Sequence, residues 1–216
     1  MPARLYIAAK PPLPGLVKTR LARTIGAESS ASLYAAFLDD LATMVAASGI
    51  PAGWFIPPAT GWSPPPLGPA QLPSRWQVGD GWGARQSRLF LEELDGDPGP
   101  LVLIASDSPQ LVAGDIRAAF AALGTADVVL GPVLDGGYYL VGMHRAHDIL
   151  ATVEMSTASV CEDVVARARG LALETTLLSP RFDVDEAADL DLLRAADAPH
   201  LTATRGWLEK ARMVPA

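Results

Sequence analysis

The sequence has few charged or aromatic side chains and many apolar ones. Of its 216 residues, 19% are charged and 6% are aromatic, whereas 50% are hydrophobic. This composition excludes intrinsic disorder, because a disordered chain has too little apolar surface to bury. The length is sufficient for one compact domain with a buried core and is short for two. We therefore expect a single domain that spans residues 1–216.

Cysteine and long unbroken apolar segments are also scarce. Cys161 is the only cysteine, which excludes an internal disulfide framework and a multi-cysteine metal site. Residues 41–74 lack charge, but glycines and prolines interrupt them too often for a membrane helix. The apolar run at the N-terminus is too short for the core of a signal peptide. These absences predict a cytoplasmic protein.

Acidic side chains outnumber basic ones, but unevenly along the chain. The 17 basic and 24 acidic residues give a formal charge of −7. This balance argues against a nucleic-acid partner, because a phosphate backbone needs a positive surface. Residues 1–26 carry five basic side chains and no acidic one, so the rest of the chain carries −12. We expect this basic segment to face the phosphates of a small ligand.

Short apolar runs alternate with longer amphipathic ones. This pattern predicts an α/β protein with a mostly parallel sheet flanked by helices, its strands buried on both faces. Residues 10–26 are expected to form a loop, and residues 57–73, with seven prolines, an irregular surface loop. Strands are expected at residues 5–9, 54–56, 75–78, 101–105, 128–130, 138–141 and 173–178. Helices are expected at residues 28–48, 82–94, 113–123, 159–169, 186–195 and 204–213, the fourth of them opened by a capping box of Ser159 and Glu162.

Ligands of such sheets bind beyond the carboxyl ends of the strands, so the residues there are candidates for a site. After the first expected strand, Lys10, Lys18 and Arg20 stand in a loop shaped by glycine and proline. Such cations bind phosphate well, although an ordinary solvated loop explains them equally well. After the fourth expected strand, Asp107 is a candidate Mg²⁺ ligand, because a carboxylate there costs desolvation unless it is paired or binds a cation. The alternative is that Asp107 or Ser108 caps a short helical turn.

Two glycine-containing segments also follow expected strands. Asp135, Gly136 and Gly137 either form a tight hairpin turn or let the backbone approach a ligand closely. Gln77 and Gly79 begin a glycine-rich polar loop. That loop either faces a ligand or is a flexible turn before the next helix.

Two aspartates near the C-terminus are a weaker candidate. Asp183 and Asp185 are two positions apart on an extended segment, and either could supply a second carboxylate to a metal ion. Acidic residues are also preferred at a helix N-terminus. That preference accounts for Asp185 and Glu186 more readily than for Asp183.

Four motifs stand in a fixed order along the chain: Ala9-Lys10-Pro11 with Gly15 to Leu21, Ser106-Asp107-Ser108-Pro109, Leu130-Gly131-Pro132 with Asp135 to Leu140, and Asp183-Val184-Asp185. Together they resemble a bacterial GT-A-fold glycosyltransferase-like family of the nucleotide-diphospho-sugar transferase superfamily. That family includes a proposed arsenosugar-biosynthesis glycosyltransferase. The first and last motifs also give the chain a partial likeness to 2-phospholactate guanylyltransferase.

The resemblance implies a Rossmann-like mixed sheet flanked by helices and a nucleotide bound across the N-terminal half. It implies a divalent cation, Mg²⁺ or Mn²⁺, at Asp107 with help from Asp183 or Asp185. Taken with the loops at the strand ends, it predicts that the nucleotide-binding residues are Ala9, Lys10, Lys18, Arg20, Gln77, Gly79, Ser106, Gly136 and Gly137.

The expected function is a metal-dependent transferase that moves a sugar from a nucleotide sugar to a small-molecule acceptor. Its catalytic residues would be Asp107 and Lys18 at the phosphates and Asp135 as the base. The alternative is a nucleotidyltransferase that joins a nucleoside triphosphate to a small phosphorylated acceptor, whose anionic nucleophile requires no strong base. A nucleotide-binding protein without turnover is a third hypothesis, although a binder need not keep a pair of metal ligands. The sequence leaves the acceptor open, and it leaves both a monomer and a homodimer open.

Overall fold

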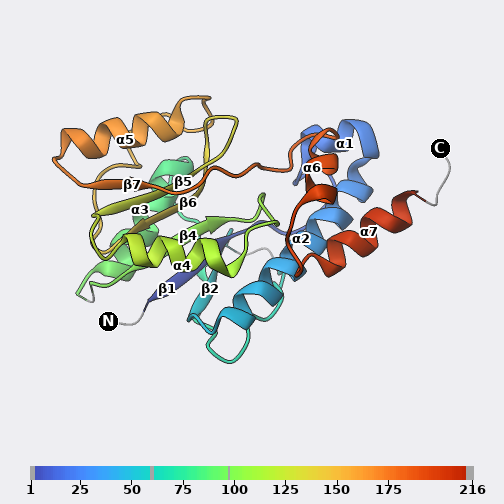
Figure 1. The fold of residues 1–216 in the computed structure, drawn as a ribbon, viewed down its shortest axis with the longest axis horizontal. Coiled ribbons are helices and arrows are strands. Elements are labelled where there is room, and N and C mark those ends of the chain that lie inside the picture. The colour runs from blue at the N-terminus through green and yellow to red at the C-terminus, as the bar shows by residue number, and fades with distance from the viewer. Residues whose placement is uncertain (1–2, 59–60, 97, 213–216) are drawn as a thin grey trace.

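The computed structural model describes residues 3–58, 61–96 and 98–212. Within them lies one seven-stranded sheet in the order β3-β2-β1-β4-β6-β5-β7, with helices on both of its faces (Figure 1). The strands are β1 (Arg4–Ala8), β2 (Ala52–Ile56), β3 (Arg75–Trp76), β4 (Leu101–Ala105), β5 (Val128–Pro132), β6 (Tyr138–Met143) and β7 (Thr175–Leu177). The helices are α1 (Thr19–Ile25), α2 (Ala27–Ser48), α3 (Trp82–Leu94), α4 (Ala113–Ala122), α5 (Val160–Gly170), α6 (Asp189–Ala195) and α7 (Thr202–Arg212).

The sheet is mixed but mostly parallel. Strand β1 runs parallel to β2 and β4, β2 to β3, and β5 to β7, whereas β6 is antiparallel to β4 and β5. The α/β fold class predicted from the sequence is therefore confirmed. The reversal at β6 arises because residues 133–137 make a tight connection between β5 and β6, as the hairpin interpretation of that segment predicts.

The side chains of β1 alternate between two apolar layers. Leu5 and Ile7 pack in the layer that includes α2, α4, α6 and α7, and Tyr6 and Ala8 pack in the layer that includes α3 and α5. Successive side chains of a strand point to opposite faces of the sheet. All four residues are buried, which is why this strand reads as a continuous apolar run.

Helix α2 buries an apolar stripe in the core and also positions α7. Phe37 and Leu41 on that stripe are fully buried. Asp40 is buried as well, and its carboxylate accepts hydrogen bonds from the backbone N–H groups of Ala203 at 2.9 Å and Thr204 at 2.8 Å. These N–H groups begin α7 and have no partner within that helix. Asp40 therefore caps α7 from outside, at the end of the molecule where α1, α6 and α7 gather beside α2 (Figure 1).

Several local predictions were wrong. The expected loop over residues 10–26 contains α1, because its last proline is Pro14 and the segment Thr19–Ile25 is rich in helix-forming Arg, Leu and Ala. The predicted capping box does not form, since Ser159 donates its hydroxyl proton to Asp163 at 2.8 Å and caps no backbone group of α5.

Helix α6 begins later than the expected residue 186. The Asp189 carboxylate accepts hydrogen bonds from the backbone N–H groups of Asp185 at 2.9 Å and Glu186 at 2.7 Å. These bonds engage the backbone of both residues outside the helix, which starts at Asp189. Strands β3 and β7 are also shorter than expected, and the expected end of α7 at Met213 lies outside the described residues.

The proline-rich segment forms no helix where the structure describes it. The indole N–H of Trp54 donates to the carbonyl of Pro65 at 2.8 Å, and Leu67 is buried against the core. The N–H of Leu72 donates to the carbonyl of Ala52 at 2.7 Å. The irregular loop predicted here is confirmed for residues 61–73, whereas residues 59 and 60 lie outside the described parts of the chain.

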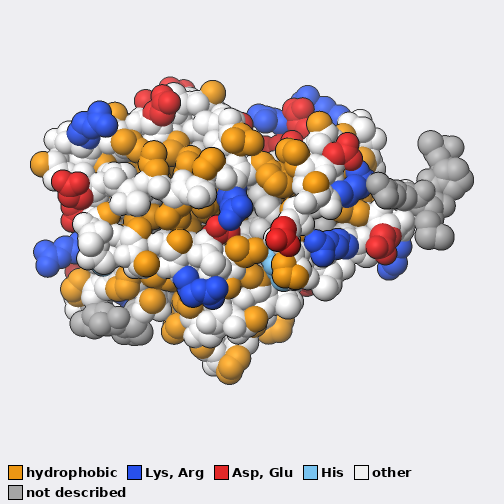
Figure 2. All heavy atoms as spheres, in the orientation of Figure 1, with side chains coloured by type: hydrophobic (Ala, Val, Ile, Leu, Met, Phe, Trp, Pro, Cys, Tyr) orange, Lys and Arg blue, Asp and Glu red, His pale blue; other side chains and the backbone are white. Residues whose placement is uncertain are grey.

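Charged side chains are dispersed over the surface shown in Figure 2. Acidic and basic side chains are intermixed at the end of the molecule formed by α1, α6 and α7. No described helix is both long and apolar enough to span a membrane.

The sheet brings loops from distant parts of the chain to one edge. Strands β1, β4 and β5 run in the same direction, so the segments that follow them leave from the same edge, and β6 begins there. Ala8 and Ala105 are paired in the β1–β4 ladder. Ala9 and Ser106 therefore leave the sheet side by side, and the predicted site residues that follow these strands share one edge.

Alanine substitutions at Gly83 and Gly206 separate two effects on the free energy of unfolding, which are close backbone packing and helix propensity. A Cβ at Gly83 in α3 would lie 2.2 Å from the Leu150 carbonyl oxygen, whereas a Cβ at Gly206 in α7 would meet nothing within 4 Å. We expect Gly83→Ala to lower the free energy of unfolding by about 2 kcal/mol through overpacking. Gly206→Ala should raise it by up to about 1 kcal/mol. Urea unfolding followed by circular dichroism measures both, and a Gly83→Ala protein as stable as the wild type would contradict this packing.

Candidate functional site

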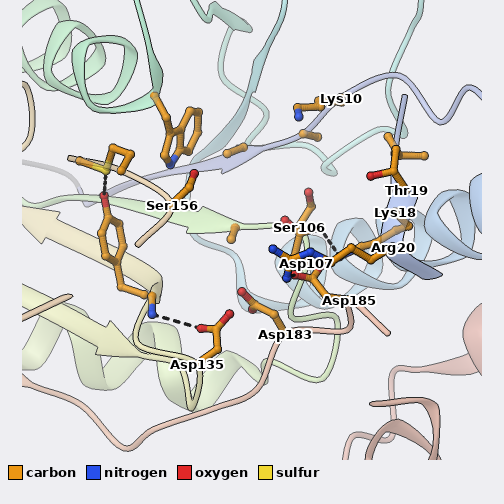
Figure 3. A pocket seen from close by; sticks show the side chains of 18 of the residues that line it. Lys10, Lys18, Thr19, Arg20, Ser106, Asp107, Asp135, Ser156, Asp183 and Asp185 are labelled. Atoms are coloured by element: carbon orange, nitrogen blue, oxygen red, sulfur yellow. Dashed lines mark hydrogen bonds and ion pairs between the residues drawn. The ribbon is translucent and has the colours of Figure 1, made fainter. Parts of the chain in front are cut away.

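A cavity of about 830 Å³ opens at the edge where β1, β4 and β5 end. Its volume lies within the roughly 300–1,000 Å³ of typical ligand pockets. It is lined by residues 8–10, 16–20, 105–107 and 155–158, with further side chains from α2, α3 and the C-terminal segment (Figure 3). Most of the predicted site residues line it: Ala9, Lys10, Lys18, Arg20, Gln77, Ser106, Asp107, Asp135, Gly137, Asp183 and Asp185.

Tyr34 on α2 joins the loops that follow β1 and β4. Its hydroxyl oxygen lies 2.7 Å from the Ser106 hydroxyl and accepts a hydrogen bond from the backbone N–H of Lys10 at 3.2 Å. Burial, together with the charge of Asp107, raises the pKa of Tyr34 to about 12. The hydroxyl is therefore protonated at neutral pH and supports both loops. The sequence prediction missed this residue, whose only signal is a polar ring within the apolar stripe of α2.

Lys18 is the most buried cation of the cavity. Its side chain is 2% exposed, and its Nζ atom contacts Asp107 Oδ1 and lies 3.2 Å from Asp185 Oδ1. Burial opposes the charge of this ammonium, but the two carboxylates outweigh burial and raise the pKa of Lys18. Arg20 is largely exposed at the rim, with Nη1 3.8 Å from Asp185 Oδ2. Lys18, which the sequence predicted to bind phosphate, is thus held between Asp107 and Asp185, which the sequence predicted to bind a metal ion.

Asp183 is the most perturbed carboxyl of the cluster. Burial and the negative charges of Asp107 and Asp185 raise the pKa of Asp183 to about 6, against the opposing effect of a hydrogen bond donated by the Ser108 hydroxyl. The backbone N–H of Val184 donates to the carbonyl of Asp107 at 2.9 Å. The C-terminal segment is thereby fixed beside the loop that follows β4, and its aspartates lie with Asp107 in Figure 3.

Asp107 and Asp183 fit a divalent cation. Carboxylate oxygens are preferred by Mg²⁺, which is usually held by one or two carboxylates plus substrate phosphates and water. A cation beside Asp183 would favour its ionised form and reduce its repulsion with Asp107. The described residues contain no group of three or more His, Cys, Asp or Glu side chains arranged to hold a metal ion. Phosphate and water would therefore have to complete the coordination.

Gln77 ties the ends of β1 and β2 together at the base of the cavity. Its side-chain amide donates to the carbonyl of Ala9 at 3.2 Å and to the carbonyl of Phe55 at 2.7 Å. Both amide hydrogens are engaged, so the carbonyl oxygen of Gln77 is the group that is left to accept a hydrogen bond. Gln77 therefore supports the backbone at the end of β1 from within the cavity lining.

Two of the predicted glycines lie outside the cavity lining. Gly79 and Gly136 do not contribute to it, whereas Gly137 does. A Cβ at Gly136, where φ is +94°, would lie 1.7 Å from the carbonyl oxygen of Ala158. The close backbone approach that this glycine permits is therefore toward Ala158 within the protein.

The wall opposite the cations is formed by Asp135 and by α3 with the segment 155–158. Asp135 Oδ1 accepts a hydrogen bond from the N–H of Gly137 at 3.1 Å. In Figure 3, Asp135 and Ser156 lie apart from the cluster of Lys18, Arg20 and Asp107. Ser156 has a positive φ of 66°, a backbone conformation that is costly for a residue with a Cβ and that concentrates at functional sites.

The same wall contains a partly buried chain of hydrogen bonds from Gln86 through Tyr138 to Met155. The Gln86 side-chain amide donates to the Tyr138 hydroxyl at 2.8 Å, and that hydroxyl donates to the Met155 sulfur at 3.7 Å. Burial raises the pKa of Tyr138, so the hydroxyl is a structural donor. Arg85 of α3 also lines the cavity, and its Nε–H donates to the carbonyl of Gly79 at 3.0 Å. The sequence prediction assigned none of these side chains to the site.

Comparisons with solved structures confirm the superfamily. The chain shares 26% identity with a "putative nucleotide-diphospho-sugar transferase" from Desulfovibrio desulfuricans G20, covering 98% of this chain and 96% of that chain with a TM-score of 0.86. A cytidylyltransferase from Leptospira borgpetersenii serovar Hardjo-bovis is 9% identical, covering 98% and 94% with a TM-score of 0.55. Rv0371c from Mycobacterium tuberculosis H37Rv is 16% identical, covering 89% and 97% with a TM-score of 0.53. The latter two share the fold alone.

No functionally curated protein matches the sequence. The model of one bacterial family does match, over residues 41–157, which is more than half of the chain. That span includes β2 to β6 and the loops that carry Gln77, Asp107 and Asp135. The chain therefore belongs to the family described as "Uncharacterized protein conserved in bacteria (DUF2064)".

Proposed function

We propose that this protein transfers a sugar from a nucleotide-activated donor to a small acceptor. The observation that carries the proposal is the division of one cavity into two walls. One wall holds Lys10, Lys18 and Arg20 with the cluster around Asp107, and the other holds Asp135, Trp82 and Met155. The likeness to the Desulfovibrio desulfuricans protein over almost the full length of both chains supports a nucleotide-activated transferase.

The cationic wall would bind the donor phosphates. Lys10 and Arg20 are exposed and line the cavity, so phosphate oxygens could reach both without displacing a buried group. A planar guanidinium and a compact ammonium are both suited to phosphate oxygens. Asp107 and Asp183 would hold a divalent cation, which when bound stabilises negative charge on the departing diphosphate.

The opposite wall would receive the acceptor. One oxygen of Asp135 accepts the N–H of Gly137 and so fixes the carboxylate, while the residue itself is exposed at the cavity. A carboxylate fixed in this way could accept the proton of an attacking hydroxyl. Trp82 and Met155 offer apolar surface on the same wall, which suits the apolar face of a sugar or another small alcohol.

Arg85 supports nucleotidyl transfer as a second candidate function. It is a half-buried cation of α3 that lines the cavity beside Trp82. A phosphorylated acceptor would require a cation on this wall, whereas an uncharged alcohol would not. The two candidates differ in their leaving groups, which are a nucleoside diphosphate for sugar transfer and pyrophosphate for nucleotidyl transfer.

The leaving group can be measured directly. We expect a panel of nucleotide sugars with MnCl₂ and small alcohols to release nucleoside diphosphate, and Asp135→Asn to lower this turnover by at least about 100-fold through loss of the base. Donor binding by Asp135→Asn should be unchanged in calorimetry, because Asp135 lies on the acceptor wall. Pyrophosphate release from nucleoside triphosphates, with no release of diphosphate from nucleotide sugars, would contradict sugar transfer and support the second candidate.

Arg20 and Arg23 on α1 form a matched pair for the donor site. Arg20 lines the cavity, whereas Arg23 is exposed and does not. Arg20→Ala should weaken the binding of a nucleoside diphosphate by at least about tenfold, or about 1.4 kcal/mol, and leave the melting temperature unchanged. Arg23→Ala should change neither quantity. Equal losses of affinity in both variants would show a general charge effect and no phosphate contact at Arg20.

A further inference from the structure

Lys18 differs from the other lysine of the cavity in what it contacts. Its ammonium contacts one oxygen each of Asp107 and Asp185, and its side chain is 2% exposed. Lys10 is exposed, and it forms no ion pair with any described residue. Lys18 is therefore already engaged in the absence of a ligand, and a phosphate could contact its ammonium only if these ion pairs rearranged.

The backbone at Lys18 is arranged to hold the side chain in this position. Lys18 has φ 47° and ψ 45°, a left-handed conformation that is unfavourable for a residue with a Cβ. Its carbonyl accepts the N–H of Ala22 at 2.8 Å at the start of α1. A strained conformation persists only where the surroundings fix it, and the two ion pairs supply that constraint.

The carboxylates remain open to the cavity although the ammonium does not. The side chains of Asp107 and Asp185 are 45% and 40% exposed. A divalent cation on Asp107 would therefore bind either the oxygen that contacts Lys18 or the other oxygen of the same carboxylate. Two positive charges within a few ångströms repel each other strongly at a partly buried site. The cation and the ammonium cannot both occupy this position between Asp107 and Asp185.

We propose that Lys18 and a divalent cation are alternative partners of Asp107, so that the site takes up the cation together with a nucleotide and not alone. The inference rests on the proposed function, which places nucleotide phosphates and a divalent cation here. Phosphate oxygens would offer the three N–H donors of Lys18 a new anionic partner and release Asp107 to the cation. Lys18 then makes cation binding conditional on the nucleotide.

The test is the affinity for Mn²⁺ with no nucleotide or sugar present, measured by calorimetry and by the electron paramagnetic resonance of free Mn²⁺. Lys18→Met should bind Mn²⁺ at least tenfold more tightly than the wild type. Lys18→Arg, which keeps the charge, should bind it as weakly as the wild type. Lys10→Met, which removes a charge that contacts no carboxylate, should leave the affinity unchanged. Equal affinities of the wild type and Lys18→Met, or no Mn²⁺ binding by either, would overturn the proposal.

A second measurement on the wild type remains decisive if Lys18→Met fails to fold. Acetic anhydride labelling followed by mass spectrometry should show Lys18 protected in buffer and increasingly acetylated as MnCl₂ is titrated to saturation. Mn²⁺ saturation with Lys18 still protected would overturn the proposal. These assays contain no donor, so a negative result in them would reject the role of Lys18 and would not reject sugar transfer. Conversely, tight Mn²⁺ binding by Lys18→Met together with no turnover of nucleotide sugars would reject sugar transfer and keep the role of Lys18.

Discussion

The buried ammonium of Lys18 is the contact on which the candidate site depends. It joins three segments that are remote in the sequence: the loop after β1, the loop after β4 that carries Asp107, and the C-terminal segment that carries Asp185. Without this cation, carboxylates from two of these segments would repel each other at the cavity wall. The ion pairs of Lys18 therefore hold these three segments together at the cavity wall. They also neutralise the negative charges of Asp107 and Asp185, which a divalent cation bound with a nucleotide would otherwise balance.

The supports around this contact are mostly uncharged. The Tyr34 hydroxyl joins the loops after β1 and β4, and the Gln77 amide holds the ends of β1 and β2. Hydrogen bonds inside a protein are stronger than in water and expensive to leave unmade. Such supports fix the walls before any ligand arrives, while Lys10 and Arg20 at the rim remain exposed.

The sequence predicted which loops meet but not how their side chains pair. Strand periodicity and the rule that ligands bind beyond strand ends were enough to bring Lys18 and Asp107 to one edge of the sheet, whereas the family resemblance was needed to place Asp183 or Asp185 with Asp107. Spacing contains no information about contacts between remote segments, so the pairing of Lys18 with two predicted metal ligands could not be read from it. Tyr34 and Tyr138 were missed because a tyrosine in an apolar run predicts core packing, and only the fold shows that its hydroxyl reaches a loop. Helix α1 was missed because the prolines before Gly15 obscured a short helical segment.

The most direct test of this account is a crystal structure of the wild type with a nucleoside diphosphate and MnCl₂, with the metal located by anomalous scattering. The account predicts a manganese peak beside Asp107 and Asp183, phosphates between Lys10 and Arg20, and the Lys18 ammonium moved from Asp107 to a phosphate oxygen. A nucleotide bound elsewhere, or bound in this cavity with the Lys18–Asp107 ion pair intact and manganese absent, would contradict it.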